Sequence, residues 1–159
     1  MPIQKITPFL WFDHQAEEAV AFYTSIFANS KIGKVIRYSE AGPGPAGSVM
    51  TIDFQLEGQS FAALNGGPHF KFTEAISFVV HCQSQEEVDI YWEKLSADGG
   101  EVQCGWVKDK FGLSWQIVPT VLLELLNDPD PEKAGRVMKA MLKMTKLEID
   151  TLKRAYDNP

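Results

Sequence analysis

The sequence predicts an α+β fold of two tandem βαβββ modules that form a cupped mixed sheet, followed by C-terminal helices. Three observations lead to this prediction. A strand pattern followed by an amphipathic helix pattern occurs twice, and the two copies begin at Ile6 and Ala75, about 69 residues apart. Residues 120–159 then change to helical spacing alone. A chain of 159 residues is long enough for one such domain with a proper core.

The first module covers about residues 1–67. Residues 3–12 are an apolar run that predicts a strand, and Pro8 indicates an edge position or a kink. Residues 16–27 carry apolar side chains at helical spacing, with two glutamates in the first turn, which predicts an amphipathic helix. Strands are expected over three further ranges, 30–40, 48–56 and 59–65, with a hairpin joining the last two.

The second module, about residues 75–119, repeats this order. Residues 75–83 predict a strand. Ser84 is the expected N-cap of the following helix, because Glu87 three residues later completes a capping box. Two more strands are expected over 101–107 and 113–118, with residues 106–111 turning between them. The paired modules therefore end near residue 119.

Residues 120–159 are expected to be a helical extension of the same domain. A short helix is predicted over 120–127, a second begins near Pro131, and a third covers 145–157. Their apolar faces must be buried on the domain or on a second subunit, so a homodimer is expected. The role of these helices is left open.

Composition narrows the function. The net charge is −6 and no Lys/Arg stripe with interleaved aromatics occurs, so nucleic acid is not an expected partner. No stretch approaches the roughly 20 apolar residues of a membrane span, and no signal peptide is recognised. Two cysteines do not make a disulfide framework. A soluble, cytoplasmic protein is expected.

Three polar residues are candidates for ligand binding. Gln116 shares its strand face with Ser114 and Val118, and it is either an outward-facing polar residue or, if that face is turned inward, a cavity-lining amide. Asn65 opens the stretch NGGP and is equally a turn residue or a ligand contact. Ser77 either lines the cup or bonds its own backbone.

Apolar and aromatic residues complete the expected site. Leu10, Phe12 and Trp106 are candidates for an apolar cup, because a ligand cavity is commonly lined by such side chains. His69 lies in a loop between aromatic residues and is a candidate lid, although a solvated loop histidine is the simpler interpretation. No histidine has a second ligand at metal-binding spacing, and Cys82 and Cys104 are expected to be structural.

Several stretches, taken in order, resemble the PhnB-like branch of the vicinal oxygen chelate superfamily, a branch labelled 3-demethylubiquinone-9 3-methyltransferase. The superfamily includes glyoxalase I, ring-cleaving dioxygenases and bleomycin-resistance proteins. The stretches are ITPFLWFDHQAEEAVAFYTSIF, LNGGPHFKFTEAISFVVHCQSQEEVDIYWEKL, CGWVKDKFGLSWQIVP and DPDPEKAGRVMKAMLKMTKLEIDTL. The resemblance covers essentially the whole chain.

The resemblance also implies where metal ligands would lie. In the metal-using relatives they come from the first, fourth, fifth and eighth strands. The matching places here are Ile6, a position near Ala63, Ala75 and Gln116. Only Gln116 carries a donor, with Asn65 nearby, and two neutral amides should not hold a transition metal. We therefore expect no bound cofactor.

The sequence thus predicts a small-molecule-binding protein with a degenerate metal site and no assigned reaction. The alternative is a metal-assisted lyase, isomerase or oxygenase, in which Gln116 and Asn65 orient the substrate and a divalent ion is recruited with it. A third hypothesis is an interaction module that binds its partner through the C-terminal helices. Methyl transfer is not supported, because no glycine-rich loop opens a helix after a strand.

Overall fold

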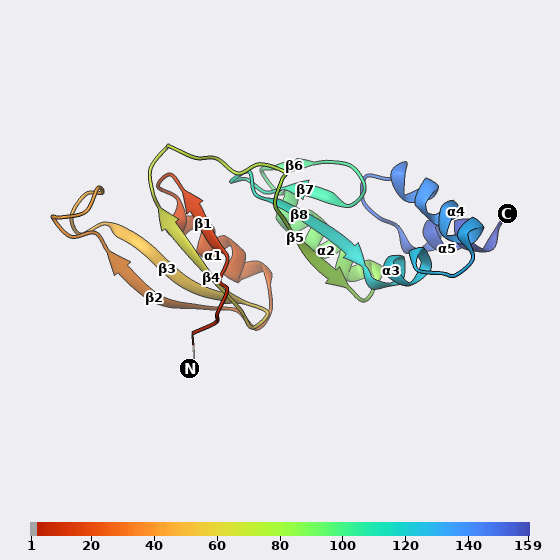
Figure 1. Cartoon of the computed structure of the whole chain (residues 1–159), viewed down its shortest axis with the longest axis horizontal. Helices are drawn as coiled ribbons and strands as arrows, with labels where there is room; N and C mark the ends of the chain where they lie inside the picture. The colour runs from red at the N-terminus through yellow and green to blue at the C-terminus, as the bar shows by residue number, and fades with distance from the viewer. Residues whose placement is uncertain (1–2) are drawn as a thin grey trace. The chain divides into compact units, whose positions relative to one another are not determined.

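The computed structural model describes residues 3–159, which form two compact units, residues 3–72 and 73–159. Each unit contains a four-stranded mixed sheet with a helix against one side, and the C-terminal helices belong to the second unit (Figure 1). Both predicted βαβββ modules are therefore present. No helix within residues 3–159 has the length and apolar character needed to span a membrane.

The first unit follows the predicted order of elements. These are β1 (Phe9–Phe12), α1 (Ala16–Ile26), β2 (Lys31–Arg37), β3 (Val49–Leu56) and β4 (Gln59–Asn65). The sheet order is β1-β4-β3-β2, in which β1 runs parallel to β4 and the other pairs are antiparallel. The parallel pair is the signature of a βαβββ module. Helix α1 returns the chain so that β2 runs in the direction of β1, and the two antiparallel connections that follow leave β4 in that direction as well.

Helix α1 is held against the sheet by aromatic packing. The ring of Tyr23 stacks on Phe54 of β3 with 6.4 Å between centroids, and Phe54 stacks on Phe61 of β4 at 5.4 Å. Tyr23 and Phe54 are almost completely buried. Since side chains alternate along a strand, residues in phase with Phe54 and Phe61 face α1, and their neighbours face the other way.

The first strand is shorter than predicted. Only Phe9–Phe12 pairs in the sheet, and Ile6 lies before it with 82% of its surface exposed. Pro8 has no backbone N–H to donate, which agrees with pairing that begins after it. The preceding segment is attached instead by the side chain of Gln4, which bonds the backbone of Ser60. The long strand expected over residues 3–12 is therefore wrong at its N-terminal end.

The second unit repeats the module and adds three helices. Its elements are β5 (Ser77–Cys82), α2 (Gln85–Ser96), β6 (Gly100–Glu101), β7 (Trp106–Lys108), β8 (Ser114–Pro119), α3 (Thr120–Leu126), α4 (Pro131–Leu142) and α5 (Ile149–Asp157). The sheet order is β5-β8-β7-β6, with β5 parallel to β8. The predicted capping box is confirmed, because the Ser84 hydroxyl accepts the N–H of Glu87 at 3.2 Å.

The turn after α2 differs from the prediction. One strand was expected over 101–107 and a turn over 106–111, but the chain forms two short strands with the turn at residues 102–105. Cys104 and Gly105 both have positive φ angles there, 58° and 85°. A cysteine is a poor signal for a left-handed residue, so the sequence does not mark this turn. As a result Trp106 lies in β7, beside β8.

The C-terminal helices share a core with the end of β8. The buried cluster consists of Val118, Leu122, Val137, Leu147 and Leu152. The segment between α4 and α5 also bonds the turn before β7, since Cys104 N–H donates to Met144 and Gly105 N–H to Thr145, at 2.9 and 2.8 Å. The third helix consequently starts at Ile149, later than predicted. Residues 120–159 are thus packed onto the second module.

Candidate functional site

The turn between β7 and β8 is organised by one buried carboxylate. Asp109 is 2% exposed, and its Oδ1 accepts the backbone N–H groups of Phe111 and Leu113 at 2.9 and 3.1 Å. Its Oδ2 accepts the indole N–H of Trp115 at 2.9 Å. Gly112 supplies the left-handed residue of the turn with φ +89°. The aspartate and glycine of this stretch therefore have structural roles.

This turn decides which way each residue of β8 points. Trp115 is buried on the side of the sheet that α2 covers, together with Val107 and Ile117. Since neighbours alternate, Gln116 points to the opposite face. We call the sheet face opposite the module's first helix the open face. Gln116 is therefore presented on the open face of the second module.

Three of the predicted site residues, Ser77, Trp106 and Gln116, meet on this face. Gln116 lies directly across from Val79 on β5 and from Trp106 on β7. Its side-chain NH₂ group donates a hydrogen bond to the hydroxyl of Ser77, with 2.9 Å between Nε2 and Oγ. All three predicted residues are half-buried, so they are accessible without being mobile surface groups. The side-chain carbonyl oxygen of Gln116, Oε1, has no hydrogen-bond partner among residues 3–159.

A fourth residue on this face was noted in the sequence only as a neighbour of Gln116. Ser114 is completely buried, and its hydroxyl has no hydrogen-bond partner among the described residues. It pairs with Ser77 on one side and Lys108 on the other, so it shares the open face with Gln116. An unsatisfied buried hydroxyl costs about 1–3 kcal/mol.

The one charged side chain beside Ser114 in the sheet, Lys108, is neutralised by an ion pair. The Lys108 ammonium forms an ion pair with the Glu74 carboxylate, and the hydrogen bond from Lys108 lowers the pKa of Glu74. The other groups are two hydroxyls, one amide and one indole ring. The open face of the second module therefore offers neutral hydrogen-bonding groups next to an aromatic surface.

Asn65 has a different position and role. It lies in the first unit, where its Oδ1 accepts the N–H of Ala16 at 2.8 Å. Its NH₂ group donates to the Glu17 carboxylate at 2.7 Å and to the Val49 carbonyl at 3.1 Å. The side chain therefore caps α1 and joins that helix to β3 and β4. Sequence reasoning missed this role, because the capped residue lies far from Asn65 along the chain.

His69 lines a pocket of about 460 Å³ in the first unit. The pocket lies between the start of α1, the loop around Gly44 and the loop that follows Asn65, and it also contains His14 and Glu17. The Gly44 loop closes against the ring of Tyr38, where no side chain would fit. His69 therefore lines a pocket of the first unit, whereas Gln116 belongs to the second unit.

Leu10 and Phe12 are placed differently from the sequence prediction. Both are buried, 6% and 3% exposed, and both lie in phase with the strand residues that face α1. Ala63, the expected fourth-strand place, is paired with Leu10 and is also fully buried. The open-face residue of that strand is Ala62, one position earlier. The shift of one residue turns each side chain to the other face of the sheet.

In neither unit do the places implied for metal ligands carry side chains that fit a metal ion. Ile6 and Ala75 lie outside the strands and are exposed, and Ala62 offers no donor. In the part of the chain that the structure describes, no three His, Cys, Asp or Glu side chains are grouped so that they could hold a metal. Around Gln116 the donors are neutral hydroxyl and amide groups, which lack the charge that a divalent transition metal needs.

Comparison with known proteins agrees with the resemblance in the sequence. The family model described as 3-demethylubiquinone-9 3-methyltransferase matches residues 4–118. A solved PhnB protein from Bacillus cereus, described with the same methyltransferase label, is 41% identical with a TM-score of 0.67. The match covers 73% of this chain and 99% of the Bacillus chain. No curated protein is similar to the chain at a significant level.

More distant structures share the fold. A protein from Pseudomonas aeruginosa is 17% identical with a TM-score of 0.61, over 74% of this chain and 98% of its own. The fosfomycin resistance protein FosX from Listeria monocytogenes is 17% identical with a TM-score of 0.52, over 75% of this chain and 94% of its own. The fold of this chain is therefore shared with both of these proteins. The family match ends at residue 118, before α3 begins.

Proposed function

We propose, from the premise that this chain belongs to the 3-demethylubiquinone-9 3-methyltransferase family, that it binds a small organic molecule on the open face of its second module. Gln116 and Ser77 would hold the polar part of the ligand. Trp106 would support its flat or apolar part.

The observation that carries this proposal is the hydrogen bond from Gln116 to Ser77. It fixes the amide so that its carbonyl oxygen remains available, and it leaves the Ser77 hydroxyl hydrogen free to donate. The ligand would therefore receive one acceptor and one donor side by side. Fixed groups of this kind bind with less loss of side-chain entropy.

Methyl transfer is not part of the proposal. Binding of S-adenosylmethionine in the common methyltransferase fold uses a glycine-rich turn between a first strand and its helix. Here the β1–α1 connection is residues 13–15 and the β5–α2 connection is residues 83–84, and neither contains glycine. The glycine-rich loops lie elsewhere, after β2 and after β4. The family label therefore does not come with the groups that this chemistry needs.

A fragment screen by thermal shift tests the proposal. Neutral aromatic compounds that carry adjacent donor and acceptor groups should raise the melting temperature of the native chain, because a ligand that binds only the folded state stabilises it. Gln116→Ala and Ser77→Ala should remove that shift, whereas Gln83→Ala, an exposed glutamine just after β5, should keep it.

The same screen distinguishes the metal-assisted alternative. If ligands bind only when Mn²⁺ or Zn²⁺ is added, and a chelator abolishes the shift, the chain would act with a recruited ion and the metal-free proposal fails. A shift that survives the chelator but also survives both substitutions would place the binding elsewhere.

A homodimer remains a second proposal. The sequence predicts a dimer from the apolar faces of the C-terminal helices, but most of that apolar surface is buried within the second unit. Leu123, Met138 and Leu142 of the tail remain exposed, at 49%, 41% and 58%. Sedimentation velocity of the native chain should show a dimer, and a monomer at all concentrations would contradict it.

A further inference from the structure

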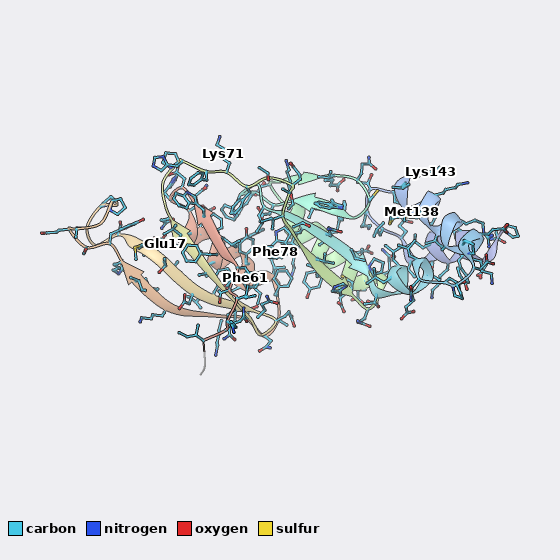
Figure 2. The ribbon with its side chains drawn as sticks, in the orientation of Figure 1. Glu17, Phe61, Lys71, Phe78, Met138 and Lys143 are labelled. Atoms are coloured by element: carbon cyan, nitrogen blue, oxygen red, sulfur yellow. The ribbon has the colours of Figure 1, made fainter. Side chains whose placement is uncertain are left out.

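A groove runs between α4 and α5, in the part of the chain that lies beyond the family match. Its volume is about 500 Å³. Ala140, Met144 and Ala155 provide small or flexible apolar surface, and Thr151 and Asn158 line the α5 side. Arg136, Lys139 and Lys143 line the α4 side, and no acidic residue lines the groove. Figure 2 labels Met138 on α4 and Lys143 directly after the end of that helix.

One of the three cations is fixed in place. The Arg136 guanidinium donates from Nε to the carbonyl of Ala155 at 2.9 Å and from Nη2 to that of Tyr156 at 2.6 Å. It therefore closes the last turn of α5, where carbonyl groups lack helical partners. A guanidinium has five N–H donors, so these two bonds leave others available for a ligand.

The other two cations are not neutralised by the protein. Lys139 and Lys143 are exposed, and neither forms an ion pair with any residue from 3 to 159. Lys146, the next cation along the chain, differs, because its ammonium lies 2.8 Å from the Asp89 carboxylate. Lys139 and Lys143 therefore add positive charge to the groove that no ion pair neutralises.

Cations near a helix C-terminus are common, because they interact favourably with the helix dipole. That effect explains a lysine at the end of α4, but it does not explain the lining of α5. Thr151, Ala155 and Asn158 follow one another at helical spacing along α5, and all are uncharged. Residues 133–147 hold five cations and no acid, in a chain whose net charge is −6. Residues 133–147 are therefore a locally basic stretch of an acidic chain.

We propose that the groove between α4 and α5 binds a small organic anion. A carboxylate or phosphate would contact the guanidinium of Arg136 and the ammonium groups of Lys139 and Lys143 through charge-assisted hydrogen bonds. A compact apolar group attached to it would lie on Ala140, Met144 and Ala155. This site is separate from the one around Gln116 and does not depend on it.

NMR titration of the full chain tests this proposal with three probes: benzoate, phenyl phosphate and benzyl alcohol. Both anions share the predicted chemistry, and comparing them shows whether carboxylate or phosphate is preferred. Each anion should cause saturable shifts of the Ala140 and Ala155 methyl signals and of the nearby amides. Benzyl alcohol has the ring without the charge and should cause none at the same concentration.

Substitutions supply the controls. The double variant K139Q/K143Q should weaken anion binding about tenfold or more, because two charged donors are lost. Lys94→Gln should have no effect, although Lys94 also lies in the last turn of a helix in the same unit. Gln116→Ala should likewise leave the anion titration unchanged. Weak unsaturable shifts at lysines in general, or equal binding by the double variant, would overturn the proposal.

Discussion

The indole N–H of Trp115 donates to the buried carboxylate of Asp109 at 2.9 Å, and this bond sets the face on which Gln116 stands. The two residues are six positions apart, one before the turn and one in β8. Because the carboxylate also accepts two backbone N–H groups of the turn, it joins the turn to the strand. A slip of one residue in β8 would turn Gln116 toward α2.

Asp109→Asn should therefore destabilise the chain by about 2–4 kcal/mol, because an amide cannot accept all three hydrogen bonds and its NH₂ group would face buried donors. Urea unfolding, followed by tryptophan fluorescence, measures the loss. Asp98→Asn, at an exposed aspartate of the same unit, should change the free energy of unfolding by less than about 0.5 kcal/mol. Equal stability of the two variants would show that Asp109 does not organise the turn.

Asn65→Ala should destabilise the first unit by about 1–3 kcal/mol, because α1 loses its cap and the link to β3. Hydrogen exchange of the Ala16 amide reports the loss directly. His69→Ala is the matched comparison. His69 lines the same pocket, and its side chain forms no hydrogen bond with any residue from 3 to 159. If Asn65→Ala leaves the Ala16 amide protected, the capping role is wrong.

These two residues show what sequence can and cannot reveal. The order of elements follows from local apolar periodicity, so both modules and the Ser84 cap were predictable. The hydrogen-bond partners of the Asn65 amide and of the Asp109 carboxylate depend on the folded structure and are not marked in the sequence. The faces of Leu10, Phe12 and Ala63 were missed for a related reason: strand parity is certain only once one register is fixed, and the first strand was predicted too long.

Leu147→Ala should cost about 2–5 kcal/mol, because Leu147 is completely buried between the C-terminal helices and the second module. Leu123→Ala, at a leucine of α3 that is 49% exposed, should cost less than about 1 kcal/mol. Denaturant unfolding of both variants measures the difference. If the tail were only an appended interaction surface, Leu147→Ala would leave the second module as stable as before.

The two cysteines should react at very different rates. Burial raises the pKa of the Cys82 thiol to about 12, and the nearby Glu87 carboxylate adds to the effect. Since the thiolate is the reactive form, Cys82 should stay unlabelled at pH 8 in the folded chain. Cys104 is half-buried and should be labelled first. Labelling with a maleimide followed by mass spectrometry should give one adduct; rapid formation of two would contradict the burial of Cys82.

The most direct test of ligand binding at the open face is the side-chain amide signal of Gln116. In the ¹⁵N-labelled chain, a compound from the thermal-shift screen should shift the NH₂ signals of Gln116 and the indole signal of Trp106 together, without added metal. Gln116→Ala should abolish the Trp106 shift. Signals that stay in place at both residues while those of the His69 pocket or the α4–α5 groove move would contradict the account.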